Sequence, residues 1–127
     1  MNRYDFGRWL GVAFVAIGVG ALALTYPPSV ALGAQLAALT AAGALFVLAG
    51  TPNPARDRYG PHRLLGLGDV LLGASIVASA VGTGPGDGGL FYLAVVGAGG
   101  VSLAAIGLGY IFRPDAFGLG PDGYPAE

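Results

Sequence analysis

The chain is divided by one polar stretch, residues 51–63, with the sequence TPNPARDRYGPHR. This stretch holds three of the six arginines and the only histidine of the protein. Uncharged apolar runs of similar length precede and follow it. The pattern predicts a polar connection between two apolar halves, and the position of this connection fixes the topology of the whole chain.

The composition is that of a membrane protein. Hydrophobic residues make up 54% of the sequence, charged residues only 10%, and the mean hydropathy is +0.69, whereas a soluble domain carries about 25% charged residues. A net charge of −1 with few basic residues argues against nucleic-acid binding, which needs a basic surface. The absence of cysteine excludes disulfides and thiolate metal sites.

Four apolar runs predict four transmembrane helices, so we expect an all-α integral membrane fold forming a single domain over residues 1–127. An 18-residue run spans about 27 Å as a helix, close to the roughly 30 Å of a bilayer core. Continuous runs also favour helices over barrel strands, in which apolar and polar residues alternate. The predicted spans are residues 9–26, 30–49, 64–81 and 90–112.

The connections predict two consecutive helical hairpins, a 2+2 bundle. Pro27 and Pro28 break the first hairpin, and Ser29 is a good N-cap for the next helix. Glycine and proline dominate the second turn, residues 82–89, and we expect the tail, residues 113–127, to be irregular. A secretory signal remains an alternative for the first run, because Ala-Leu-Ala at residues 21–23 resembles a cleavage site.

The arginines predict the orientation. Four spans place both termini and the central stretch on the same side of the membrane, and arginines near span ends are retained in the cytoplasm. We therefore expect a protein of the plasma membrane with both termini and the loop at residues 51–63 in the cytoplasm. All six arginines obey this rule: Arg3, Arg8, Arg56, Arg58, Arg63 and Arg113.

A shift of 55 residues aligns parts of the first and third spans. It places Leu10-Gly11 on Leu65-Gly66 and Gly18 on Gly73, as in parallel membrane repeats. Such matches arise easily in a chain this rich in leucine, glycine and alanine, so duplication and coincidence both remain open. Small residues also recur at helical spacing in every span, which favours close packing within the chain, between copies, or with another membrane protein.

Asp69 is the only Asp, Glu, Arg, Lys or His residue inside a predicted span. A carboxylate there costs roughly 2.5 to 3.5 kcal/mol at the membrane centre, so it is a candidate for function. His62 lies on the same helix face, and Tyr110 is a further possible partner. The arginines that end at the same level are Arg63, Arg8 and Arg113. The sequence allows a structural ion pair or hydrogen bond between Asp69 and one of these groups, or a role in handling protons or cations.

The other polar residues carry weaker hypotheses. We expect Gln35 to form an interhelical amide hydrogen bond, and His62 to be a loop residue, since one histidine without cysteine cannot complete a metal site. Hydroxyl groups inside the spans are expected to bond back to their own helices. The G-x-G-x-x-G match at residues 84–89 follows a helix, which argues against nucleotide binding. The predicted hydroxyl donors are Thr40, Ser75, Ser79 and Ser102.

No catalytic constellation, metal site or cofactor motif is recognisable, so an enzyme is the least favoured function. The leading hypothesis is a structural or accessory component that packs with itself or with a larger membrane complex. The alternative is a small oligomeric transporter or channel that uses Asp69 as an intramembrane carboxylate.

Overall fold

The computed structural model describes residues 2–83 and 89–125, with side chains described outside residues 81–83. Over these residues the protein is all-helical apart from one isolated β-bridge between Leu119 and Pro125. Four of the helices are long and apolar enough to cross a membrane. The elements are α1 (Arg3–Thr25), α2 (Val30–Gly50), α3 (Pro54–Tyr59), α4 (Pro61–Thr83), α5 (Gly89–Phe112) and the 3₁₀ helix η1 (Pro114–Phe117).

Short polar side chains cap the N-termini of the first three helices. The Asn2 side chain accepts hydrogen bonds from the backbone N–H groups of the first turn of α1, and Asn53 does the same for α3. The predicted N-cap role of Ser29 is confirmed, because its hydroxyl oxygen accepts from the Leu32 N–H at 3.2 Å. Gly60, with φ of 85°, separates α3 from α4, a conformation that glycine adopts without strain.

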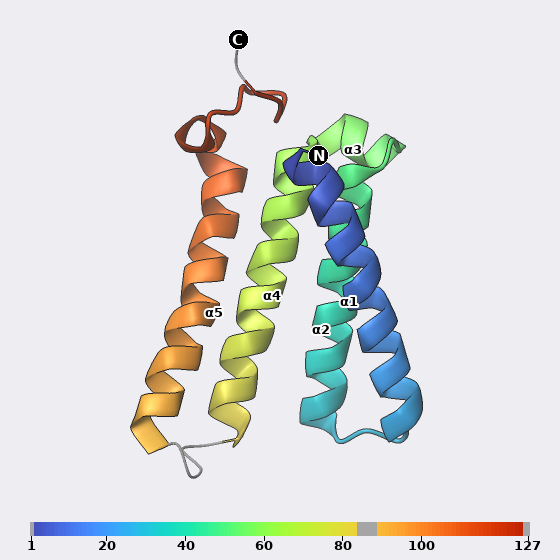
Figure 1. Ribbon diagram of the computed structural model, residues 1–127, viewed down its shortest axis with the longest axis vertical. Helices are drawn as coiled ribbons and strands as arrows, with labels where there is room; N and C mark the ends of the chain where they lie inside the picture. Colours follow the sequence, from blue (N-terminus) through green and yellow to red (C-terminus); the bar gives the residue numbers. More distant parts are fainter. Residues whose placement is uncertain (1, 84–88, 126–127) are drawn as a thin grey trace.

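The long helices form a row rather than a closed bundle (Figure 1). Helix α1 packs along α2, α2 packs on α4, and α4 packs along α5. Among the described residues, α5 makes extensive contacts only with α4 and η1. Both ends of the described chain and α3 lie at the same end of the row, which we call the arginine end because the six arginines lie there. Most of α5 therefore faces the surroundings.

The helices extend beyond the predicted spans at the arginine end. Helix α1 starts at Arg3 instead of residue 9, and α4 starts at Pro61 instead of residue 64. The predicted loop at 51–63 contains α3, and the predicted irregular tail contains η1. Charge composition marks where an apolar span ends, but caps mark where a helix ends, and here the two differ. Most of the predicted glycine-rich turn, residues 84–88, lies outside the described residues.

Pairs of glycines set the distance between neighbouring helices. Gly11 of α1 faces Gly43 of α2, and a Cβ atom on either would overlap the backbone carbonyl oxygen of the other. Gly66 of α4 and Gly107 of α5 face each other in the same reciprocal way. Lipid gives helices no hydrophobic reason to associate, so this close backbone approach supplies van der Waals contact that larger residues would prevent.

The two glycine pairs occupy matching positions. Gly66 lies 55 residues after Gly11, the shift that aligns the first and third spans, and Gly107 lies 64 residues after Gly43. A shift of 55 residues thus relates α1 to α4, and a shift of 64 residues relates α2 to α5. At this level the contact between α4 and α5 repeats the contact between α1 and α2.

Each helix pair makes a second close contact about two helical turns further from the arginine end, and the same two shifts relate these second contacts. A Cβ on Gly18 of α1 would meet the carbonyl oxygen of Leu36 at 3.3 Å, and one on Gly73 of α4 would overlap the carbonyl oxygen of Gly100. Gly73 and Gly100 are the residues related to Gly18 and Leu36 by the shifts of 55 and 64. Matching contacts at matching positions are a stronger sign of duplication than identities in a sequence of this composition.

We expect Gly107→Ala and Gly97→Ala, both on α5, to have opposite effects. The new methyl group of Gly107→Ala collides with α4, whereas a Cβ on Gly97 meets nothing within 4 Å. Gly107→Ala should lower the unfolding free energy by about 1–3 kcal/mol, the usual cost of overpacking. Gly97→Ala should leave it unchanged or raise it by up to about 1 kcal/mol through helix propensity. Unfolding titrations in detergent micelles measure both, and equal effects would contradict the glycine contact.

Candidate functional site

Asp69 lies on α4 along its line of contact with α5. The residue is half-buried, and a Cβ on Gly107 of α5 would lie 2.9 Å from the Asp69 Cβ. Within residues 2–83 and 89–125, the Asp69 carboxylate forms no hydrogen bond or ion pair. It is therefore a carboxylate at a helix–helix contact without a partner from the described chain.

The residues predicted to accompany Asp69 do not bond to it. The Tyr110 hydroxyl accepts a hydrogen bond from the Arg3 guanidinium at 3.2 Å, and its ring stacks on Phe117 with 4.2 Å between centroids. Arg63 is exposed at the start of α4. No hydrogen bond joins Asp69 to Tyr110, Arg63 or His62 in the described part of the chain, so the structure does not assemble them into one site.

The first helix pair carries phenylalanine where Asp69 lies in the second. Asp69 is 55 residues after Phe14. A Cβ on Gly43 would lie 2.9 Å from the Phe14 Cβ, the same separation as between Gly107 and Asp69. Phe14 completes an apolar contact with Phe46, whose ring centroid is 5.9 Å away. The matching contact of the first helix pair is therefore made with an apolar side chain in place of a carboxylate.

His62 lies in the first turn of α4 and not in a loop, which corrects the sequence-based expectation. Its side chain is 3% exposed and packs between Gly60 and Gly123, both of which have positive φ. A Cβ atom on either glycine would overlap the imidazole ring. The His62 Nδ1 atom is buried without a hydrogen-bond partner. The segment around Gly123 thus covers the only histidine of the chain.

The tail folds back over the arginine end, which the sequence analysis did not anticipate. The Tyr4 hydroxyl donates to the carbonyl oxygen of Gly123, and the Tyr4 and Tyr124 rings meet edge to face at 6.0 Å. Arg56 donates to the Tyr124 hydroxyl, and Leu119 is buried. The aromatic residues and glycines of the tail are the sequence features from which this packing could have been predicted.

The start of the tail also carries the one ion pair found among the described residues. Arg113 and Asp115 lie 3.3 Å apart, and both are exposed to solvent. The hydrogen bond from Arg113 lowers the pKa of Asp115 below its ordinary value. An exposed pair of this kind adds little stability because water and salt screen it.

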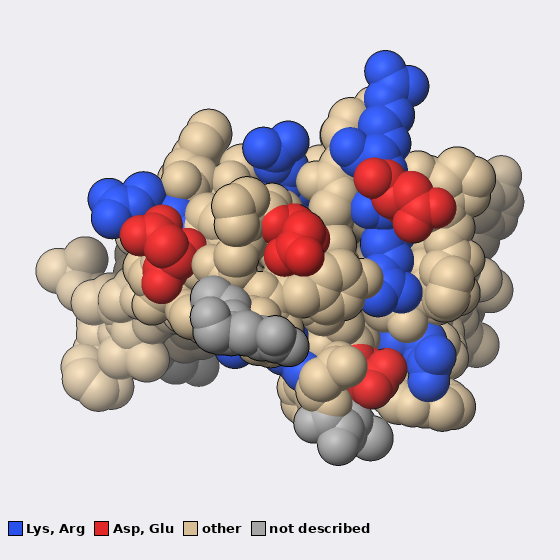
Figure 2. All heavy atoms as spheres, turned by 90° about the horizontal axis from the view of Figure 1, so that it is seen from above, with Lys and Arg blue, Asp and Glu red and all other residues tan. Residues whose placement is uncertain are grey.

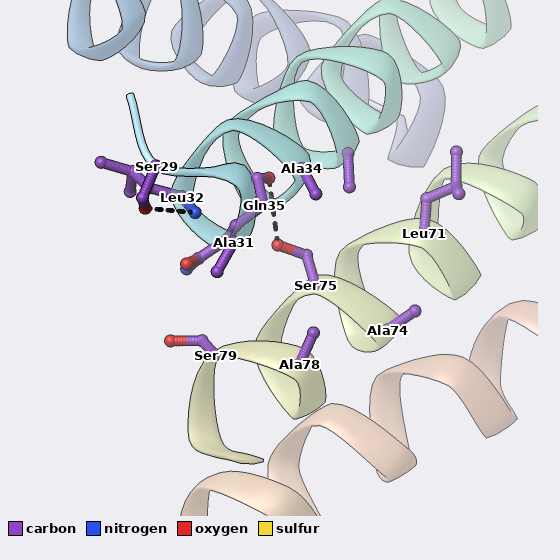
Figure 3. Close-up of a pocket in the computed structure, with 11 residues that line it drawn as sticks. Ser29, Ala31, Leu32, Ala34, Gln35, Leu71, Ala74, Ser75, Ala78 and Ser79 are labelled. Atoms are coloured by element: carbon purple, nitrogen blue, oxygen red, sulfur yellow. Dashed lines mark hydrogen bonds between the residues drawn. The ribbon is translucent and has the colours of Figure 1, made fainter. Parts of the chain in front are cut away.

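An open groove separates the far halves of α2 and α4 (Figure 3). Its volume is about 510 Å³, and its lining is mostly alanine and leucine. The Ser75 hydroxyl donates to the backbone carbonyl oxygen of Gln35 across the groove at 3.3 Å. This bond differs from both expectations, since Ser75 bonds to another helix and Gln35 accepts through its backbone. Thr40 and Ser102 do bond back to their own helices, as predicted.

Basic and acidic side chains are spread among uncharged residues over the arginine end of the molecule (Figure 2). A cavity of about 350 Å³ at this end lies between α3, the start of α4 and the tail. Three arginines line it together with two aspartates. The charged lining residues are Arg56, Arg58, Arg63, Asp57 and Asp122.

A repeated motif underlies this end of the molecule. Residues 3–11 read RYDFGRWLG and residues 58–66 read RYGPHRLLG, so Arg, Tyr, Arg, Leu and Gly recur at the same spacing. The shift is again 55 residues, but an alignment that begins at the apolar spans overlooks the charged part of the match. Arg and Tyr are scarce in this chain, so these identities are far less easily produced by composition than matches of leucine or glycine.

Comparison with known proteins gives one match. The model of a family described as "Family of unknown function (DUF7994)" matches residues 1–122. No curated protein and no solved structure matches the chain significantly. Within the described residues, no group of three or more histidine, aspartate or glutamate side chains is placed to hold a metal ion.

We expect Gly123→Ala to detach the tail from His62, with Gly118→Ala as its matched control. Both glycines have positive φ, so alanine costs roughly 1–2 kcal/mol of backbone strain at either position. Only a Cβ on Gly123 also overlaps the imidazole, whereas one on Gly118 meets nothing within 4 Å. Hydrogen exchange of the amides at 119–125 should therefore accelerate more in Gly123→Ala. Equal acceleration in both variants would show that His62 does not anchor the tail.

Proposed function

The chain belongs to the DUF7994 family of unknown function, and we propose that it acts as a structural or accessory membrane protein. In this proposal it crosses the plasma membrane as two hairpins and packs against itself or a larger membrane complex. The four apolar helices support a membrane location. The row arrangement supports association, because among the described residues the long helix α4 packs along one side of the outer helix α5 and no other long helix covers it.

The observation that carries the proposal is a face of small residues on α5. Gly100 and Gly107 of α5 point toward α4. Helical geometry places a second set of small residues on the opposite side, where their exposure confirms that no part of the described chain covers them. Small residues permit close helix contact in lipid. The members of this outer face are Ala94, Ala98, Ser102 and Ala105.

We also propose that the arginine end faces the cytoplasm. Both ends of the described chain, α3 and all six arginines lie at that end of the row. Positively charged residues next to membrane spans are retained on the cytoplasmic side during insertion. Tyrosine and tryptophan residues also lie near this end, and these residue types are enriched where helices meet the membrane–water interface.

A second candidate function rests on Asp69. Because Phe14 occupies the matching position in the first helix pair, that pair makes the matching contact without a carboxylate. An ionisable group inside a span supports a proton- or cation-handling role. In this alternative the chain is a small oligomeric transporter or channel.

We expect a complex extracted from its native membrane with a mild detergent to be heavier than the 12.6 kDa chain plus bound detergent. Ala98→Leu should weaken that association, because leucine keeps the partner helix away from the outer face. The control Val101→Leu enlarges an exposed residue beside that face and should leave the mass unchanged. Native mass spectrometry measures the outcome, and a monomeric wild-type chain would contradict the accessory role.

The transporter alternative makes a different prediction. We expect Asp69→Asn to retain thermal stability, since the matching position of the first helix pair holds an uncharged side chain, and to abolish ion- or proton-driven flux in proteoliposomes. Asp5→Asn, a carboxylate of the first turn of α1, is the control for loss of one charge. Wild-type protein without measurable flux for protons, sodium or potassium would exclude this function.

A further inference from the structure

The two copies of the arginine–tyrosine motif, residues 3–11 and 58–66, differ in the hydrogen bonds of their side chains. In the first copy, the Arg3 guanidinium donates to the Tyr110 hydroxyl and to the carbonyl oxygen of Phe117 at 3.3 Å. The Tyr4 hydroxyl donates to the carbonyl oxygen of Gly123. The Arg3 and Tyr4 donors of this copy are thus occupied by oxygen atoms of the protein, most of them from the tail. Arg8 forms no side-chain hydrogen bond among the described residues, and its guanidinium lies 5.4 Å from the centroid of the Trp9 ring.

The second copy differs at the residues that match Arg3 and Tyr4, since the side chains of Arg58 and Tyr59 form no hydrogen bond within the described residues. Arg58 and Arg63 are exposed and line the cavity of about 350 Å³. Neither guanidinium forms a hydrogen bond or ion pair with any residue in 2–83 or 89–125. The Arg58 guanidinium rests on the Tyr59 ring, 5.4 Å from its centroid, which holds it at the rim of the cavity.

The charge balance of the cavity favours an anion. Its three arginines exceed its two aspartates by one charge. One of the aspartates is already engaged, because an Asp122 side-chain oxygen accepts from the Tyr124 N–H at 3.0 Å. Guanidinium groups present paired N–H donors that match the oxygens of phosphate. The cavity lies at the arginine end, beyond the apolar part of the helices, which is where lipid headgroups meet water around a chain that crosses a bilayer.

We propose that this cavity binds a phosphate-type oxyanion through Arg58 and Arg63. A phosphodiester with one negative charge balances the lining, and its oxygens take the place that tail oxygens take in the first copy. The phosphate group of an anionic lipid and a free phosphate ion share this chemistry. The structural role proposed for α5 is independent of this site.

The test compares Arg63→Gln with Arg8→Gln in the full-length protein. Arg8 is the matching residue of the first copy, lies at the same end and does not line the cavity. Native mass spectrometry with phosphatidylglycerol and phosphatidylcholine measures lipid binding, and calorimetry with inorganic phosphate measures the soluble ion. Arg63→Gln should weaken binding of the preferred phosphate probe about tenfold, the usual effect of losing a charge-assisted hydrogen bond, and Arg8→Gln should leave it unchanged.

Asp122→Asn is a second test that can be used if Arg63→Gln does not fold, because it should change the affinity for phosphate in the opposite direction. Asparagine keeps the oxygen that accepts from Tyr124 but removes the negative charge, so phosphate binding should tighten several-fold. Preference for phosphatidylglycerol identifies a lipid site, and binding of inorganic phosphate identifies a soluble anion site. The proposal is overturned if neither probe binds, if Arg8→Gln and Arg63→Gln weaken binding equally, or if Asp122→Asn has no effect.

Discussion

Close backbone contact between glycines is the constraint on which this structure depends. The chain has little hydrophobic driving force for helix association inside a bilayer, so its helices must approach closely enough for dispersion forces to hold them. Gly11 with Gly43 and Gly66 with Gly107 permit that approach. Each pair also helps to fix the register between its helices, because a sliding motion would bring larger side chains to the level of the close contact.

Most of the fold could be predicted from the sequence. Uncharged runs of bilayer length specify four helices, and Ser29 and the prolines specify one of the breaks between them. The row arrangement could not be predicted, because small residues occur on several faces of every span and do not say which faces meet. The charged ends were also misjudged, since α1 and α4 continue through arginines that mark the end of an apolar span but not of a helix.

The candidate site was predicted only in part. Asp69 stands out in any reading of the sequence because it is the only Asp, Glu, Arg, Lys or His residue inside an apolar run. Its environment did not follow from helical spacing: His62 turns toward the tail and Tyr110 toward Arg3 and Phe117. These directions depend on a tail that packs through a few aromatic rings and glycines, and composition alone reads such a segment as irregular.

Matching positions of the two helix pairs can be compared to distinguish residues that make the helix contacts from residues that do not. Both pairs keep the glycines of the helix contact, so these belong to the architecture. Phe14 and Asp69 share a position but not a chemistry, and only the phenylalanine contributes an aromatic contact to the core. The arginine–tyrosine motif shows the reverse, since Arg3 and Tyr4 donate to oxygen atoms of α5 and the tail, while the side chains of Arg58 and Tyr59 form no hydrogen bond among the described residues. The two helix pairs therefore serve as an internal comparison, in which the positions that agree carry the helix contacts and the positions that differ are those at which the two pairs depart in chemistry.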